Sequence, residues 1–195
     1  METTQDYTTI ARFAAPALGI KPQVFTYYDQ DEKRSIDVMN VTDPIDENIC
    51  IYCTIGVSDS PNVIEMNDGT LGIPVELLIA ADNKFVKMPN ILSTCGFYIL
   101  KNEWPCQPGT VFKNMVTMYY QDTDMKHILF TRPYLWQDKL HPLTLEQRTI
   151  HFLLCIPISD KELEYKNQYG TAALEEILFQ DSGADIYNIN RHSVV

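Results

Sequence analysis

The sequence predicts an α+β fold, in which residues 1–195 form a single domain with a mixed, mainly antiparallel sheet and helices packed on it. Three observations support this prediction. Short β-type runs in the first third are joined by short polar turns, which suit antiparallel neighbours because parallel strands need a longer crossover. Helical periodicity recurs near both ends and once in the middle of the chain. No linker, internal repeat or low-complexity segment divides the chain.

The composition is that of a folded, acidic protein. Apolar residues make up 45% of the chain, and 26 acidic against 15 basic residues give a net charge of −11. Such a surface repels nucleic acid and anionic membranes, because phosphate binding needs clustered Lys and Arg. It would speed the encounter with a basic partner, although an acidic surface equally serves solubility. We therefore expect neither a nucleic-acid nor a membrane partner.

The first residues lack the features of a targeting segment. METTQDYTTIARFAAPALGI has no basic start and no continuous apolar core, so we do not interpret it as a secretory signal. No stretch approaches the ~18 apolar residues that span a bilayer. The five cysteines lie mostly inside apolar runs, and without an export signal we expect them to be reduced thiols in a cytoplasmic protein.

The first third of the chain reads as a helix followed by a meander. A helix is predicted over residues 3–18, where apolar side chains recur at helical spacing, and Pro16 and Gly19 mark its end. Three strands follow, joined by the polar connections DQDEKRS and TDPIDEN, and they cover residues 24–28, 36–41 and 49–57. Connections this short predict antiparallel neighbours.

The rest of the chain alternates between β-type and helical patterns. The turn signal NDGT precedes a strand at 74–81, and a helix is predicted over 85–101 with Pro89 in its first turn, where a missing N–H costs little. Three β-rich segments come next, namely TVFKNMVTMYY, KHILFTRPYLW and TIHFLLCIPI. Two short helices and a tail complete the predicted order.

Two spacings raise the question of catalysis or metal binding. Cys50 and Cys53 have the CxxC spacing of zinc and redox sites, but residues three apart in a strand point to opposite faces, and nothing completes four ligands. His151 and Cys155 share a strand face, yet they lie ~13 Å apart along an extended backbone, too far for a nucleophile and its base. We expect both pairs to be buried core residues.

Motifs for nucleotide binding or hydrolysis are missing. NDGTLG lacks the Lys-Ser/Thr of a P-loop and the three glycines of the dinucleotide fingerprint, and no G-x-S-x-G occurs. We therefore predict no catalytic residue, no cofactor and no metal site.

Two groups of residues are candidates for binding a partner. The first consists of acidic side chains in predicted loops, namely Asp29, Asp31, Glu32, Asp43, Asp46 and Glu47. The second lies in YYQDTDM, where tyrosine mixed with acid suits an interface, namely Tyr119, Tyr120, Asp122 and Asp124. Solvated loop charge and ordinary turn chemistry of Asp are the alternative interpretations, and both stay open.

The segment after the last strand has a strong helix-start signal. Ser159 can accept from the N–H of Glu162, while the Glu162 side chain reaches back to the N–H of Ser159, which makes a capping box. Glu162 and Lys166 are spaced for an ion pair along the helix. Gly170 ends this helix, and a second amphipathic helix follows.

This layout, FLLCIPISDKELEYKNQYGTAALEEIL, resembles the signature of the suppressor-of-fused-like domain family. That signature has an apolar strand ending in P-I-[ST], an acidic helix and then G-x-x-x-L-x-x-x-L. PVELLIAA, HILFTRPYLW and the tail NRHSVV are similar to further segments of the family. The resemblance covers residues 70–195 well and the first third only loosely.

The resemblance implies a binding domain rather than an enzyme. Bacterial single-domain members of this length look like immunity proteins, or antitoxins of toxin–antitoxin systems, paired with LXG-type polymorphic toxins that carry nuclease tips. We therefore expect an immunity protein that neutralises a basic cognate toxin in the cytoplasm of the producing bacterium. The alternatives are a general peptide-binding or scaffold module that uses a sheet edge and, third, a metal-dependent or hydrolytic enzyme. The oligomeric state stays open.

Overall fold

A computed structural model describes residues 2–179 and 184–195. The helices are α1 (Glu2–Leu18), α2 (Met88–Asn102), α3 (Asp160–Tyr169) and α4 (Thr171–Phe179), with 3-10 turns η1 (Val57–Asp59) and η2 (Tyr134–Trp136). The strands are β1 (Ile20–Tyr28), β2 (Ser35–Thr42), β3 (Ile49–Ile55), β4 (Val63–Met66), β5 (Gly69–Gly72), β6 (Val75–Asp82), β7 (Val111–Phe112), β8 (Met125–Thr131), β9 (Leu143–Thr144) and β10 (Thr149–Ser159).

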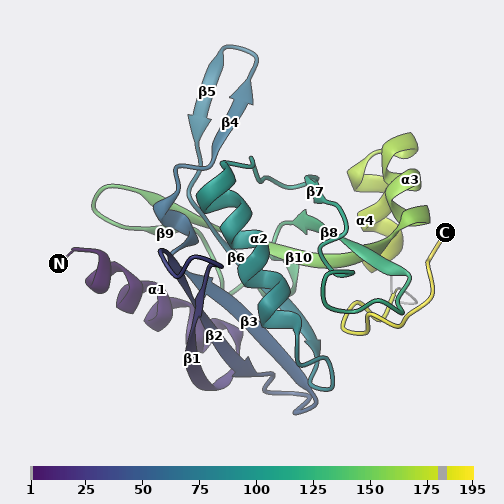
Figure 1. The fold of residues 1–195 in the computed structure, drawn as a ribbon, viewed down its shortest axis with the longest axis horizontal. Helices are drawn as coiled ribbons and strands as arrows, with labels where there is room; N and C mark the ends of the chain where they lie inside the picture. The colour runs from purple at the N-terminus through teal and green to yellow at the C-terminus, as the bar shows by residue number, and fades with distance from the viewer. Residues whose placement is uncertain (1, 180–183) are drawn as a thin grey trace.

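One sheet of eight strands organises the molecule, in the order β1-β2-β3-β6-β10-β8-β7, with β9 paired to the start of β10. Only β6 and β10 run parallel, and every other neighbouring pair in this sheet is antiparallel. The predicted α+β fold with a mixed, mainly antiparallel sheet is therefore confirmed. β4 and β5 form a separate two-stranded hairpin that projects from the body, joined by the predicted NDGT turn (Figure 1).

The central strands are buried on both faces, so the sheet separates two cores. In β6, Leu77 and Ile79 belong to the core under α2, whereas Leu78 belongs to the core under α1 and α4. α2 lies across one face of the sheet (Figure 1). This burial explains why residues 77–81 of β6, LLIAA, are apolar without alternation. Within the described residues, no helix combines the length and the apolar character that crossing a membrane requires.

The structure corrects three predicted element boundaries. β1 begins at Ile20, four residues before the expected start. Only Val111–Phe112 of the β-rich segment 110–120 pairs as a strand, and the rest forms turns. β8 ends at Thr131, because the following Arg132-Pro133 leads into η2 and proline cannot donate to a ladder.

A buried carboxylate supports the turn after β3. Glu76 of β6 is fully buried and accepts hydrogen bonds from the Thr54 hydroxyl (2.6 Å) and from the backbone N–H groups of Gly56 (2.8 Å) and Ser58 (3.2 Å). Gly56 has a φ of 108°, which favours glycine at this turn. Burial raises the pKa of Glu76 to about 7, although the hydrogen bonds from Thr54, Gly56 and Ser58 lower it.

We predict a pH-dependent contribution of Glu76 to stability. Because its folded pKa of about 7 lies above its usual 4.5, its contribution should be greatest below pH 4.5 and decline as the pH rises through 7. Urea unfolding across this range should show the decline in the wild type but not in Glu76→Gln, which keeps an acceptor and loses the titration. The exposed Glu65→Gln serves as the control and should follow the wild type.

The C-terminal segment is held by a buried ion pair. The predicted capping box is confirmed, since the N–H of Glu162 donates to Ser159 (3.1 Å) and the N–H of Ser159 donates to Glu162 (3.0 Å). Glu162 pairs with Arg191 rather than with Lys166, and Arg191 also donates to the carbonyl of Pro157 (3.0 Å). The expected pairing of Glu162 with Lys166 is thus wrong, because the carboxylate is fully buried and faces the tail.

Removing Arg191 should destabilise the protein strongly. Arg191→Met leaves the Glu162 carboxylate buried without its cation, which costs about 3–5 kcal/mol in comparable buried pairs. Urea unfolding should report this loss, and limited proteolysis should show earlier cleavage within 184–195. The exposed Arg12→Met should change neither measurement, and equal stability of the two variants would contradict the assigned role.

Candidate protein-interaction surface

The outermost strand β1 carries exposed apolar side chains on both faces of the sheet, because the consecutive residues Val24 and Phe25 point to opposite sides. Ile20, Val24, Phe25 and Tyr28, which we call the apolar edge strip, are 46%, 49%, 51% and 62% exposed. The strand lies at the end of the sheet order, so its outer edge has no strand neighbour among the described residues. Such an edge is a template for another chain. At its start, Lys21 with a φ of 53°, Pro22 and a register irregularity interrupt regular pairing.

The first acidic turn, residues 29–34, is fastened to the C-terminal end of α2. The Asp29 carboxylate accepts from the N–H groups of Lys33 (2.8 Å) and Arg34 (3.2 Å) and pairs with Lys101 (2.6 Å). The Arg34 guanidinium donates to the carbonyl of Leu100 at 2.6 Å. The hydrogen bond from Lys101, followed by those from the turn backbone, lowers the pKa of Asp29.

Asp29 is therefore occupied within the protein. It is 8% exposed, and its carboxylate is engaged by the turn backbone and Lys101, which corrects its assignment to the free surface. Asp31 and Glu32 in the same turn are exposed and remain candidates for partner binding. Asp29 differs from Asp31 and Glu32 through its contact with Lys101, which is far away in the sequence, so local sequence could not separate the three residues.

The second acidic turn, residues 43–48, is shaped by its own carboxylates. Asp43 accepts from the N–H groups of Ile45 (2.8 Å) and Asp46 (3.0 Å), and Asp46 accepts from the N–H of Asn48 (2.9 Å). These are the short side-chain-to-backbone bonds typical of Asp in turns. Glu47 and Asp46 are exposed, and Ile45 between them is 95% exposed.

The two acidic turns lie at opposite ends of the apolar edge strip. Tyr28 pairs with Ser35 at one end of the β1–β2 hairpin, and Ile20 pairs with Thr42 at the other. Nine residues of strand separate the turns by about 30 Å at ~3.3 Å per residue. The acidic residues of these two loops thus form two separate clusters, with the exposed apolar residues of β1 between them.

The tyrosines of the second predicted group anchor a loop on α2. The Tyr119 hydroxyl lies 2.6 Å from the Thr94 hydroxyl, and the Tyr120 hydroxyl accepts from the N–H of Lys87 (2.8 Å). Burial raises the pKa of Tyr120. These contacts give both tyrosines a structural role, whereas Asp122 and Asp124 are exposed.

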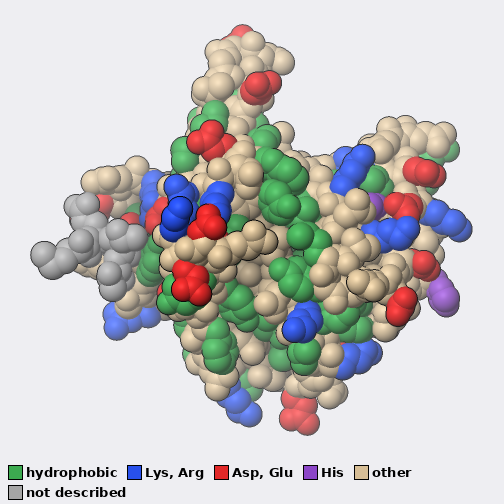
Figure 2. Space-filling view, viewed as in Figure 1, with side chains coloured by type: hydrophobic (Ala, Val, Ile, Leu, Met, Phe, Trp, Pro, Cys, Tyr) green, Lys and Arg blue, Asp and Glu red, His purple; other side chains and the backbone are tan. Residues whose placement is uncertain are grey.

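An exposed valine connects this loop with the apolar edge strip. Val86 is 67% exposed and lines a small hollow of about 170 Å³ together with Phe25 and Tyr52. Its neighbours in sequence, Phe85 and Lys87, both contact Tyr120. Hydrophobic side chains also emerge along α2 on this face (Figure 2). Sequence reasoning missed Phe25 and Val86, although Lys21-Pro22 is a signal of an edge strand.

The cysteine and histidine spacings do not assemble a reactive site. Cys50 and Cys53 pack against different cores, as predicted for residues on opposite faces of a strand. Cys155 is buried, and burial raises its pKa well above the usual value. His151 is exposed, so its predicted burial is wrong, because the start of β10 lies at the rim of the sheet. Among the described residues, no three His, Cys, Asp or Glu side chains group as a metal site.

The strand order and the helices on both faces define a fold of the suppressor-of-fused class. The structure is similar to a suppressor of fused homologue from Neisseria gonorrhoeae FA 1090, with a TM-score of 0.70, 19% identity and coverage of 100% of this chain and 98% of that one. It is also similar to a chain of the Sufu–Fu complex, with a TM-score of 0.68, 17% identity and coverage of 97% and 92%. These similarities concern the fold alone.

The chain belongs to the suppressor of fused protein (SUFU) family, whose sequence profile matches residues 32–192. The match starts well before residue 70, so the family resemblance extends further toward the N-terminus than the motifs alone indicated. A relative from Bacillus subtilis (strain 168), immunity protein YqcF, is 38% identical over 195 residues, which are 100% of both chains.

We predict different consequences for the two acidic residues of the first turn. Asp29→Ala should lower the urea midpoint of unfolding, because it removes the acceptor for two backbone N–H groups and the partner of Lys101. Since the folded pKa of Asp29 is depressed, its contribution should persist above its usual pKa and shrink as the pH falls through the folded value. Asp31→Ala is the matched control and should unfold like the wild type.

Proposed function

We propose that this protein is an immunity protein that binds a cognate toxin and neutralises it in the cytoplasm of the producing cell. The observation that carries the proposal is the relative YqcF, named an immunity protein, which is 38% identical over the full length of both chains. Similarity along the whole chain favours a shared way of acting, by binding rather than by catalysis. The net charge of −11 and the exposed apolar edge strip fit a binding protein with a basic partner.

The partner that suits this surface is a basic toxin, such as a nuclease. A nuclease must attract phosphate and therefore presents positive charge, which an acidic inhibitor can engage quickly and block. Asp31 and Glu32 at one end of the strip and Asp46 and Glu47 at the other would guide such a partner, while Phe25 and its apolar neighbours would supply the desolvated centre.

Co-expression with the toxin encoded beside this gene tests the function. The wild type should restore growth, and unchanged killing would overturn the proposed function. A triple variant, Asp31→Lys with Glu32→Lys and Glu47→Lys, should weaken toxin binding by about tenfold or more and slow association, most clearly at low salt.

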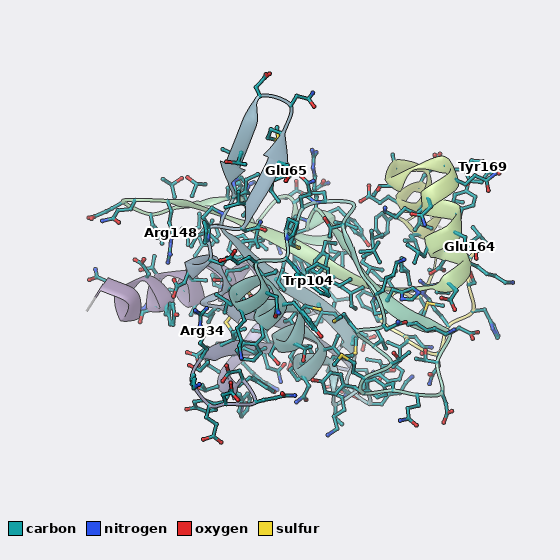
Figure 3. All side chains as sticks on the ribbon, turned by 45° about the horizontal axis from the view of Figure 1, so that its top comes forward. Arg34, Glu65, Trp104, Arg148, Glu164 and Tyr169 are labelled. Carbon is teal, nitrogen blue, oxygen red and sulfur yellow. The ribbon has the colours of Figure 1, made fainter. Side chains whose placement is uncertain are left out.

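A matched triple variant serves as the control, because it changes the net charge equally at distant sites. Glu65→Lys, Glu164→Lys and Glu176→Lys alter exposed residues of β4, α3 and α4, two of which are labelled in Figure 3. This control should bind the toxin nearly as the wild type does. If growth is restored but both triple variants bind equally, the function stands and the assigned surface is wrong.

A second candidate function, a general peptide-binding or scaffold module, is favoured by one observation. β1 is a nine-residue edge strand with exposed side chains, to which an extended peptide could add as a further strand. Backbone pairing depends little on salt, so this module would bind several partners with affinities that change little between low and high salt. The same binding measurements therefore separate the two candidates.

A further inference from the structure

A large cavity lies away from the apolar edge strip. It is a cleft of about 980 Å³ at the N-terminal ends of β6 and β10, between the base of the β4–β5 hairpin and the η2 segment. Its apolar walls come from stretches far apart in sequence and include Leu71, Ile73, Pro108, Pro133, Tyr134 and Phe152. A cavity of this size stands at the upper end of the roughly 300–1,000 Å³ typical of sites for drug-sized ligands.

The charges that line the cleft are all basic. Among the described residues, no Asp or Glu lines it, although the chain contains 26 acidic residues. The lining includes Arg132, Arg148, His141 and His151, and all of these except Arg148 are exposed. Half of the four histidines of the chain thus lie in one cavity.

Arg148 lines the cleft, and its guanidinium is held by residues that do not line the cleft. Its guanidinium pairs with Asp6 (3.2 Å) and Asp59 (3.0 Å) and donates to the carbonyl of Ser58 (3.2 Å). It lies near α1 and the base of the hairpin (Figure 3). Its charge is therefore largely compensated within the protein, while its Nε–H has no hydrogen-bond partner among the described residues.

The basic side chains of the cleft without an ion pair to a described residue are found at the exposed positions. His141 and His151 make no ion pair with a described residue, and Arg132 has only a longer-range interaction with Glu175. Burial raises the pKa of Glu175, and Arg132 offsets that rise only in part. An apolar cavity with basic groups and no carboxylate disfavours cations and favours an anion that also buries hydrophobic surface.

We propose that this cleft binds a small organic anion with an apolar body, such as an aryl sulfonate or a long-chain carboxylate. The apolar walls would cover the body of the ligand, and Arg132, His141 and His151 would lie near its charged end. The site is separate from the apolar edge strip, so this inference does not depend on the binding of a toxin.

A pair of fluorescent probes tests the proposal directly. Anilinonaphthalene sulfonate and N-phenyl-1-naphthylamine share the same ring system, and only the former carries a negative charge. The sulfonate should bind saturably at one site and more tightly than the neutral probe, despite the net charge of −11. Dodecanoate should displace it. An unchanged near-ultraviolet circular dichroism spectrum would establish that the native fold is the species that binds.

Charge changes at the cleft provide the decisive comparison. His151→Glu and, separately, His141→Glu should weaken the sulfonate by about fivefold or more and leave the neutral probe unaffected. His192→Glu, an exposed histidine outside the cleft, makes the same change in net charge and should bind both probes like the wild type. The proposal is overturned if the sulfonate binds no better than the neutral probe, or if the cleft variants behave like His192→Glu.

Discussion

The parallel pairing of β6 with β10 is the constraint on which the rest of the structure depends. It joins Val75–Leu78 to His151–Leu154, and most side chains of both strands are buried. Two apolar faces require two covering layers, which α2 supplies on one side and α1 with α4 on the other. β3 and β8 occupy the flanks of this pair, so β1 and β2 extend the sheet outward. β1 is thus exposed because the positions next to the central pair are occupied by β3 and β8.

Local patterns predicted much of this fold, because local interactions create them. The helix over 3–18, the first meander and the Ser159–Glu162 cap each depend on residues close in sequence, and all three are confirmed. Interactions between residues far apart in the sequence could not be predicted from local patterns. Glu162 binds Arg191 and Asp29 binds Lys101, and neither partner is marked by a local pattern. In the segment 110–120, the β-type composition wrongly predicted a strand along the whole segment. Tyr119 and Tyr120 are held by contacts with α2 and the residue before it, and not by strand pairing.

The positions of the charged residues in the structure reveal surface features that the net charge does not predict. Acidic residues gather in the two turns at the ends of β1, whereas no acidic residue of the described ranges lines the cleft near the starts of β6 and β10. Net charge alone predicted a basic partner, and it contained no information about a cavity of the opposite character. Turn chemistry also accounts for Asp43 and Asp46 without a partner, so the exposed Asp31, Glu32 and Glu47 are the residues most available to one. The candidate surface is therefore smaller than the acidic composition suggests.

The late position of β10 in the chain has a consequence for how the protein folds. β1, β2, β3 and β6 lie within the first 82 residues and can pair antiparallel, the first three through short connections and β6 after the β4–β5 hairpin. Until residues 149–159 arrive, β6 is the open edge of that sheet, apolar on both faces. Docking of β10 is a long-range event, and topologies of this kind fold slowly and expose aggregation-prone edges meanwhile. β6, which is buried in the folded protein, is thus the strand whose open edge most needs shielding from other chains while the protein is being synthesised.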